Sequence, residues 1–342
     1  MKRMVTVRKT KSARGPNPPV AIVNGEHRPA PDGEAGATAV DGEARGAGVQ
    51  ADPGLAAVVT AREVAANLDR FQPAPRRRMM APIKVVVNGV HGRVGREVLQ
   101  TLCREDDIVP VGGADLVATA DSLDLPDESG SVPMSKDLAD VLGDAEVVVD
   151  FSSAEGAMDS IRTASSKGVN VVVGTTGLSE DDYKEAGELA NTRQVGVIIA
   201  PNFAMGAVLM THLLKQAARF FDYADLTEMH HEAKIDAPSG TAIAMAKALA
   251  EGKGDDFTTT PTEREMIANT RGGVAGGVSI HSARMPGRMA HHEVVFGALG
   301  QTLTIRHDSI NRESFMPGVM MAIRHAVESP GLTVGLDKIM GL

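Results

Sequence analysis

Short, continuously apolar segments alternate with helix-like segments between residues 83 and 203, and this alternation restricts the fold more than any other feature of the chain. The apolar segments are "IKVVVNG" (83–89), "DIVPVGGAD" (107–115), "AEVVVDF" (145–151), "GVNVVVGTTG" (168–177) and "VGVIIAPNF" (195–203). Segments with helical spacing lie between them, for example residues 93–105, 152–168 and 179–194. Because strands that are apolar along their whole length are buried on both faces, we predict an α/β domain with a Rossmann-like, doubly wound parallel sheet over residues 81–205.

The second half of the chain follows a different pattern. A long amphipathic helix is expected over residues 205–221, a strand over 225–231 and another helix from Ser239. Three segments between 278 and 309 alternate with period two, which indicates strands of a mixed or antiparallel sheet. We therefore predict a second α+β domain over 206–311. A last helix over 314–329 is expected to pack on the first domain.

Residues 1–80 are rich in Gly, Ala and Pro and have no sustained apolar period. Such a composition buries too little apolar surface to offset chain entropy, so we predict a disordered and dispensable extension. One short helix over 55–71 is compatible with the pattern. A start codon assigned too far upstream would account for the extension equally well, since Met79 and Met80 directly precede the first strand.

The composition excludes several classes of partner. A net charge of −9 argues against nucleic acid, because phosphate binding requires a positive field. No run reaches the roughly 18 apolar residues of a membrane-spanning helix. The single cysteine, Cys103, cannot form an internal disulfide and suits the cytoplasm. A small anionic substrate stays compatible with the sequence where a few basic residues converge.

Three glycines follow the first predicted strand and precede a helix in "NGVHGRVG". Gly89, Gly92 and Gly95 allow a tight turn and a close approach of the backbone to a pyrophosphate at the helix N-terminus. Their spacing is G-x-x-G-x-x-G and not G-x-G-x-x-G, so an ordinary strand-to-helix turn is the alternative. The loops at 174–176 and 200–203 follow later strands and belong to the same sheet edge, where ligands of such sheets bind.

The run "EMHHEAKIDAPSGTA" (228–242) combines two histidines, a lysine and a helix start in one loop. The backbone amides of Ser239, Gly240 and Thr241 are available to an anion, and an imidazole can supply a proton. This combination suits a carboxylate-bearing substrate. A metal site is disfavoured, because adjacent side chains on a strand diverge and no further ligand completes a set. The alternatives are a solvated loop lysine and, for Asp236, a turn or cap residue.

The same run closely resembles the signature of the dihydrodipicolinate reductase family. Further matching segments occur in family order between residues 83 and 342, namely "GVHGRVG", "DFSSAEG", "VVGTTG", "IAPNFAMGA", "IHSARMPG" and "LTIRHDS". Two mild departures from the family pattern are Ala290 and Gln301, neither of which lies in the signature.

The resemblance implies reduction of 4-hydroxy-tetrahydrodipicolinate, a small dicarboxylate, by NADH or NADPH in lysine and diaminopimelate biosynthesis. It also implies that residues 312–342 complete the dinucleotide-binding domain and that residues 206–311 serve for substrate binding and oligomerisation into a homotetramer. It implies catalytic roles for His230 and Lys234 and substrate contacts for His231, Gly240 and Thr241, to which the helix start adds Ser239. Implied cofactor contacts are Gly89, Val90, His91, Gly92, Arg93, Val94, Gly174, Thr175, Thr176, Ala200, Pro201, Asn202 and Phe203.

Asp115 lies where the second strand of a dinucleotide-binding domain carries the acid that binds the ribose hydroxyls of NAD. We therefore expect NADH to be at least as good a cofactor as NADPH. In the alternative, Asp115 only caps a turn and Arg93 reaches a 2′-phosphate. Two other functions stay open at this stage: an aspartate- or homoserine-type dehydrogenase, and a non-catalytic nucleotide-sensing regulator. Retention of both His230 and Lys234 argues against the regulator.

Overall fold

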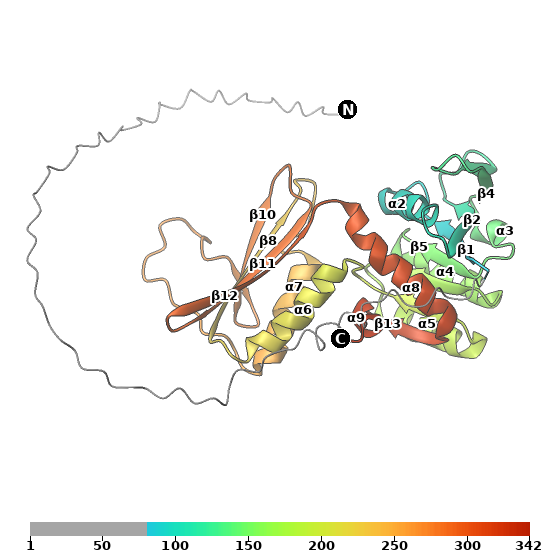
Figure 1. The fold of residues 1–342 in the computed structure, drawn as a ribbon. Coiled ribbons are helices and arrows are strands. Elements are labelled where there is room, and N and C mark those ends of the chain that lie inside the picture. Colours follow the sequence, from blue (N-terminus) through green and yellow to red (C-terminus); the bar gives the residue numbers. More distant parts are fainter. Residues whose placement is uncertain (1–80) are drawn as a thin grey trace, which may run out of the picture. The chain divides into compact units, whose positions relative to one another are not determined.

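The computed structural model describes residues 81–342, which form two β-sheets with their helices (Figure 1). The expected disorder of residues 1–80 and the helix over 55–71 lie outside the described residues. The first part of the described chain runs through β1 (Ile83–Asn88), α2 (Arg93–Leu102), β2 (Ile108–Ala114), β3 (Ser122–Asp124), β4 (Ser131–Ser135), α3 (Leu138–Val141), β5 (Val147–Asp150), α4 (Ala154–Ser166), β6 (Asn170–Val173), α5 (Glu180–Arg193) and β7 (Gly196–Ile199).

The first sheet has eight strands in the order β13-β7-β6-β5-β1-β2-β4-β3, and every pair except β3–β4 is parallel. From the central β1 the chain proceeds to β2 and β4 on one side and to β5, β6 and β7 on the other. The point of reversal lies between β1 and β5, at the carboxyl ends of the strands, where such folds bind ligands. Residues 147–150 are buried throughout. The predicted doubly wound parallel sheet is therefore confirmed.

The C-terminal segment contains η2 (Arg312–Phe315), α8 (Met316–Glu328), β13 (Gly331–Val334) and α9 (Leu336–Met340). Val319 and Ile323 of α8 share one apolar cluster with Val85, Val98 and Ile198 of the first sheet and α2. β13 pairs in parallel with β7 and extends the sheet at that edge. The predicted packing of the last helix on the first sheet is confirmed. β13 was not predicted from the sequence, because its four half-buried residues lack a recognisable strand pattern.

The second sheet belongs to α6 (Met205–Ala218), β8 (Tyr223–His230), α7 (Gly240–Lys253), β9 (Gly273–Ala275), β10 (Val278–Arg284), β11 (Ala290–Ala298) and β12 (Gln301–Ser309). Its order is β12-β11-β8-β10-β9, with β8 and β10 parallel and the other pairs antiparallel, so the predicted mixed sheet is confirmed. Side chains of α6 and α7 cover one face, as shown by a cluster that includes Leu214, Leu249, Leu226, Val294 and Phe296.

β8 places chemistry on the covered face of the second sheet. Because side chains alternate along a strand, Ala224, Leu226, Glu228 and His230 all point to the same side. The first two are apolar and pack in the core, whereas the last two are polar and buried. The strand thus carries a carboxylate and an imidazole from the core to the loop that follows residue 230. Within residues 81–342, no helix is both long and apolar enough to span a membrane.

Candidate active site

The glycine loop after β1 has a backbone that other residues cannot readily follow. Gly89 has φ +77°, and a Cβ on Gly95 would lie 2.1 Å from the carbonyl oxygen of Gly89. Gly92 is the N-cap of α2 and contributes no side-chain hydrogen bond there, so the first amides of the helix have no side-chain cap. These features fit a loop that lets a pyrophosphate approach the backbone at a helix N-terminus.

Asp150, the last residue of β5, holds the neighbouring loops together from a fully buried position. Its carboxylate accepts hydrogen bonds from Asn88 Nδ2 at 2.7 Å and from Ser160 Oγ at 2.6 Å. It also accepts from the backbone N–H and the hydroxyl of Ser152 and from Thr175 Oγ1. No role was predicted for Asp150 from the sequence, although its place at the end of an apolar strand was a usable signal.

A cavity of about 490 Å³ opens beside these loops. It is lined by residues from two of the predicted cofactor segments, by residues 151–154 and by Arg312 of η2. The predicted cofactor residues among its lining are Arg93, Val94, Gly174, Thr175 and Thr176. We refer to this space as the nucleotide cavity.

A second cavity, of about 330 Å³, joins the sheet edge to the loop after β8. We refer to it as the histidine cavity, because four imidazoles line it: His230, His231, His292 and His307. Lys234 and Thr241 lie on the same side, whereas Gly174, Pro201, Asn202 and Phe203 come from the loops of the first sheet. Val94 and Arg312 border both cavities. The structure therefore brings the predicted catalytic residues next to the predicted cofactor loops.

His230 is held by a buried carboxylate on its own strand. Its Nδ1 contacts Oε2 of Glu228, and the His230 side chain is only 9% exposed. Burial lowers the pKa of His230; the positive charges of Lys234 and Arg284 act in the same direction, and Glu228 opposes them. No role was predicted for Glu228 from the sequence, although Glu228 begins the signature run.

The loop between β8 and α7 is tied down at several points. Lys234 Nζ forms an ion pair with Asp236 Oδ1 at 2.8 Å. The hydrogen bond from Lys234 is the main reason why the pKa of the Asp236 carboxyl is lowered. Arg284 Nη2 donates to the carbonyl of Asp236 at 2.7 Å. Asp236 is therefore a partner of the predicted catalytic lysine and not merely a turn or cap residue.

The start of α7 has the expected N-cap, but the predicted availability of the Ser239 amide to an anion is wrong, because this N–H donates to Glu228 Oε1 at 3.2 Å. Ser239 is the N-cap of α7, and the Ser239 hydroxyl accepts a hydrogen bond from the backbone N–H of Ala242 at 3.2 Å. Thr241 lines the histidine cavity, but the other two predicted residues do not. Ser239 is buried and Gly240 is exposed.

His292 and His307 form a cross-strand pair on β11 and β12 that the sequence analysis did not assign to the site. The rings of His230 and His292 pack edge to face, with centroids 5.5 Å apart. Burial, followed by the charge of His230, lowers the pKa of His292 to about 4. Period-two spacing predicted both strands, but only the pairing of β11 with β8 brings these imidazoles to His230.

Other predicted site residues lie outside both cavities. The side chains of Val90 and Ala200 belong to the apolar core, so any contact with a cofactor there is made by the backbone. Asp115 accepts hydrogen bonds from the backbone N–H groups of His91 at 2.9 Å and Val117 at 3.2 Å. Asp115 therefore caps a turn and also supports the glycine loop.

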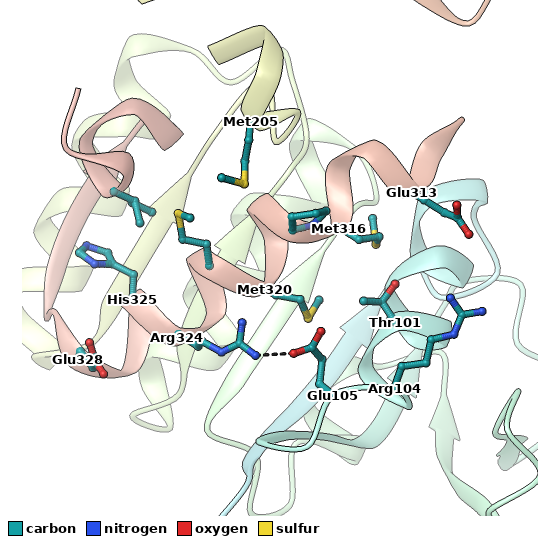
Figure 2. A pocket seen from close by; sticks show the side chains of 13 residues that line it. Thr101, Arg104, Glu105, Met205, Glu313, Met316, Met320, Arg324, His325 and Glu328 are labelled. Atoms are coloured by element: carbon teal, nitrogen blue, oxygen red, sulfur yellow. Dashed lines mark hydrogen bonds and ion pairs between the residues drawn. The ribbon is translucent and has the colours of Figure 1, made fainter. Parts of the chain in front are cut away.

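A larger cavity, of about 780 Å³, lies elsewhere. Figure 2 shows the side chains of Met205, Met316 and Met320 gathered along it, with the Arg324–Glu105 ion pair at its border. None of the predicted site residues lines it. The smaller histidine cavity is the better candidate for an active site, because it combines buried titratable groups with the cofactor loops. Among the described residues, no cluster of three or more His, Cys, Asp or Glu is arranged to hold a metal ion.

A doubly wound sheet with a glycine loop, joined to a mixed-sheet region that supplies histidines and a lysine, defines a two-part protein of the nucleotide-dependent oxidoreductase type. The sequence model "Dihydrodipicolinate reductase, N-terminus" matches residues 83–203, and "Dihydrodipicolinate reductase, C-terminus" matches residues 206–340. The chain belongs to the dihydrodipicolinate reductase family.

Relatives and a solved structure agree with this assignment. The chain is 48% identical over 265 residues to 4-hydroxy-tetrahydrodipicolinate reductase of Dehalococcoides mccartyi, covering 77% of this chain and 100% of that protein. It is 42% identical over 268 residues to the enzyme of the same name from Moorella thermoacetica, covering 77% of this chain and 99% of that protein. A dipicolinate-bound dihydrodipicolinate reductase from Paenisporosarcina sp. TG-14 has a TM-score of 0.67 and 34% identity, covering 75% of this chain and 99% of that one.

Proposed function

We propose that this protein reduces 4-hydroxy-tetrahydrodipicolinate to tetrahydrodipicolinate with NADH or NADPH, in lysine and diaminopimelate biosynthesis. The observation that carries the proposal is the histidine cavity, which is lined by His230 and Lys234 together with Gly174 and Asn202 of the cofactor loops. The proposal extends to this chain the activity for which its relatives are named.

The residues present fit a nicotinamide dinucleotide. The glycine loop and the N-terminus of α2 would hold its pyrophosphate, because the backbone there admits no larger side chain at Gly89 or Gly95. The loops at 174–176 and 200–203 would border its nicotinamide end, since Gly174 and Asn202 reach the histidine cavity. When bound, the cofactor supplies a hydride.

The substrate is a dicarboxylate, and the cavity offers groups that suit its charges. Lys234 supplies a cation, Thr241 a hydroxyl, and the N-terminus of α7 backbone amides that favour an anion. His231 lines the same side of the cavity. We assign these residues to the binding and orientation of the substrate.

The hydroxyl group of the substrate leaves as water, and addition of a hydride to the unsaturated ring leaves an electron pair that must be protonated. We assign this proton transfer to His230 as general acid, with Lys234 stabilising the developing negative charge. A lowered pKa makes the imidazolium a stronger acid and reduces its population near neutral pH. We therefore expect kcat to fall as the pH rises through this lowered pKa.

We further propose that the enzyme acts in the cytoplasm as a homotetramer assembled through the second sheet. In support, Leu303 of β12 is 40% exposed and Ile310, just beyond β12, is 84% exposed. Single apolar side chains at such exposure are common, but several along one edge of a sheet suit an interface.

A coupled assay tests the activity. The upstream synthase forms the substrate from pyruvate and aspartate semialdehyde. In its presence the purified protein should oxidise NADH or NADPH, which is measured as a loss of absorbance. Oxidation of NADH or NADPH by aspartate semialdehyde alone, or reduction of NAD+ or NADP+ by homoserine, would favour another dehydrogenase, and binding of NADH with no turnover would favour a regulator. His230→Ala and Lys234→Ala should each reduce kcat by about 10²–10⁴-fold and leave the Kd for NADH unchanged. Normal turnover in both variants would contradict the assigned roles.

A further inference from the structure

Glu228 is a fully buried carboxylate that the reaction as described above does not use. It lies two residues before His230 on β8, so both side chains point to the same face of the strand. A buried carboxylate is unfavourable unless it is paired and hydrogen-bonded. The hydrogen-bond and ion-pair partners of Glu228 therefore indicate why a charged residue is present at this buried position.

Arg284 of the neighbouring strand β10 supplies the charge that pairs with Glu228. Its Nη2 lies 2.7 Å from Oε1 and its Nη1 lies 3.0 Å from Oε2, a bidentate arrangement. Burial by itself would raise the pKa of Glu228, but hydrogen bonds from Arg284, Ser282 and His230 outweigh burial and lower the pKa. Glu228 is thus ionised at neutral pH.

An ionised carboxylate only accepts hydrogen bonds, so the contact between Oε2 and Nδ1 requires the proton of His230 to be on Nδ1. The remaining nitrogen, Nε2, is then the one that exchanges a proton with a molecule in the histidine cavity. The same carboxylate also favours the imidazolium, against the effects of burial, Lys234 and Arg284. Glu228 therefore acts on both the tautomer and the charge of His230.

The Glu228 network also reaches the substrate side of the cavity. Oε1 accepts a hydrogen bond at 3.2 Å from the backbone N–H of Ser239, the N-cap of α7. Arg284 Nη2, which binds Oε1, also donates to the carbonyl of Asp236, and Asp236 pairs with Lys234. One buried carboxylate thus connects the imidazole with the loop that carries the lysine and with the start of α7.

We infer that Glu228 is a positioning residue, which fixes Nε2 of His230 as the proton-exchanging nitrogen and, through Arg284, holds the loop of Lys234 in place. The inference rests on the proposed role of His230 as general acid. In the competing account, Glu228 and Arg284 only stabilise the fold. The two accounts differ in the pH profile, because only a carboxylate that acts on the imidazole moves its titration.

Glu228→Gln tests the inference, because glutamine has nearly the same shape and no charge. We expect kcat to fall by at least about 10²-fold, because the general acid loses its tautomer and charge partner. The decline of kcat with rising pH should move to lower pH, as should the His230 titration followed by NMR. The Kd for NADH should stay at the parent value.

Asp308→Asn is the matched control. Asp308 accepts from Nδ1 of His291 at 2.6 Å, a similar pair on β12 and β11, but neither residue lines the histidine cavity. This variant should keep the kcat and pH profile of the parent. Glu228→Asp serves if the glutamine variant does not fold: it retains the charge beside Arg284, so kcat should fall while the pH profile moves less.

Parent-like kcat in folded Glu228→Gln or Glu228→Asp would overturn the inference. A reduced kcat with an unmoved pH profile, accompanied by weaker NADH binding or lower stability, would overturn it in favour of a structural role. These outcomes differ from failure of the proposed function, in which His230→Ala itself would retain turnover.

Discussion

Two fully buried carboxylates, Asp150 at the end of β5 and Glu228 near the end of β8, hold the loops of the two halves of the site in different ways. The donors to Asp150 are neutral amide and hydroxyl groups and one backbone N–H. The donors to Glu228 include a guanidinium and an imidazole. The first carboxylate organises a binding edge, and the second is coupled to a group that titrates.

The difference matches what each region has to do. A loop that cradles a nucleotide has to keep one shape, and neutral donors around an acid provide this without a change of charge near neutral pH. A region that moves a proton needs a group whose protonation changes, together with a fixed charge that controls where the proton goes. We therefore expect changes in the first region to affect stability and cofactor binding, and changes in the second to alter pH dependence.

Loss of the Asp150 carboxylate should have the largest effect on stability. Asp150→Ala leaves several buried donors without their acceptor, so the free energy of unfolding should fall by about 3–5 kcal/mol. The loops at 152 and 175 lose their common partner, and NADH should bind more weakly. Urea denaturation and calorimetric titration measure the two quantities. Asp159→Ala, an exposed acid on α4, is the control and should change both little.

The comparison would fail if Asp150→Ala shifted the pH profile of kcat while stability stayed unchanged. In that case the nucleotide side would take part in the proton chemistry, and the separation between the two carboxylates would not hold.

His292 should make the second region sensitive to acid. Its pKa, lowered by burial to about 4, lies below that of a histidine in the unfolded chain, so the unfolded state binds a proton first as the pH falls. Stability contributed by neutral His292 is present above about pH 6.5 and is lost progressively towards pH 4. The loss should reach up to about 3 kcal/mol, a value that follows from the size of the pKa shift.

Urea denaturation at pH 7 and pH 4.5 measures this dependence. In His292→Gln the side chain stays neutral at both values, so the difference in stability between them should shrink. An equal difference in the parent and the variant would assign the acid sensitivity to other groups. Four titratable neighbours shift the pKa of His292 through their charges: the imidazoles of His230, His291 and His307 and the carboxylate of Glu228.

Asp115 should give the smallest of these effects, on the choice between cofactors. A hydrogen bond to a charged group is worth about 1.5–3 kcal/mol, so Asp115→Ala should lower kcat/KM for NADH by roughly 10–100-fold. It should lower kcat/KM for NADPH less, because the carboxylate repels a 2′-phosphate. Asp115→Asn retains an acceptor for the N–H of His91 and removes the charge, so it separates ribose recognition from loop support. A strong preference of the parent for NADPH, or an unchanged ratio in both variants, would contradict the role of Asp115.

Patterns within short stretches of sequence were sufficient for most of the fold. Continuous apolar strands indicated the parallel sheet, because burial on both faces demands apolar side chains throughout. Period-two alternation indicated the strands of the second sheet, and Ser239 before an apolar helix indicated its N-cap. The β3–β4 hairpin, α3 and β13 were not predicted, because short elements at a sheet edge bury few residues and have no clear period.

The sequence by itself determined the two-part fold and the loop that carries His230 and Lys234, because both are specified by residues close together in the chain. Only the tertiary structure decided which groups surround that imidazole. Glu228 meets Arg284 through the pairing of β8 with β10, and His230 meets His292 through the pairing of β8 with β11. Strand order and register bring together residues more than 50 positions apart, and burial then sets their pKa values. Neither the pairing of the strands nor the burial of these residues can be obtained from the composition or spacing of any single segment.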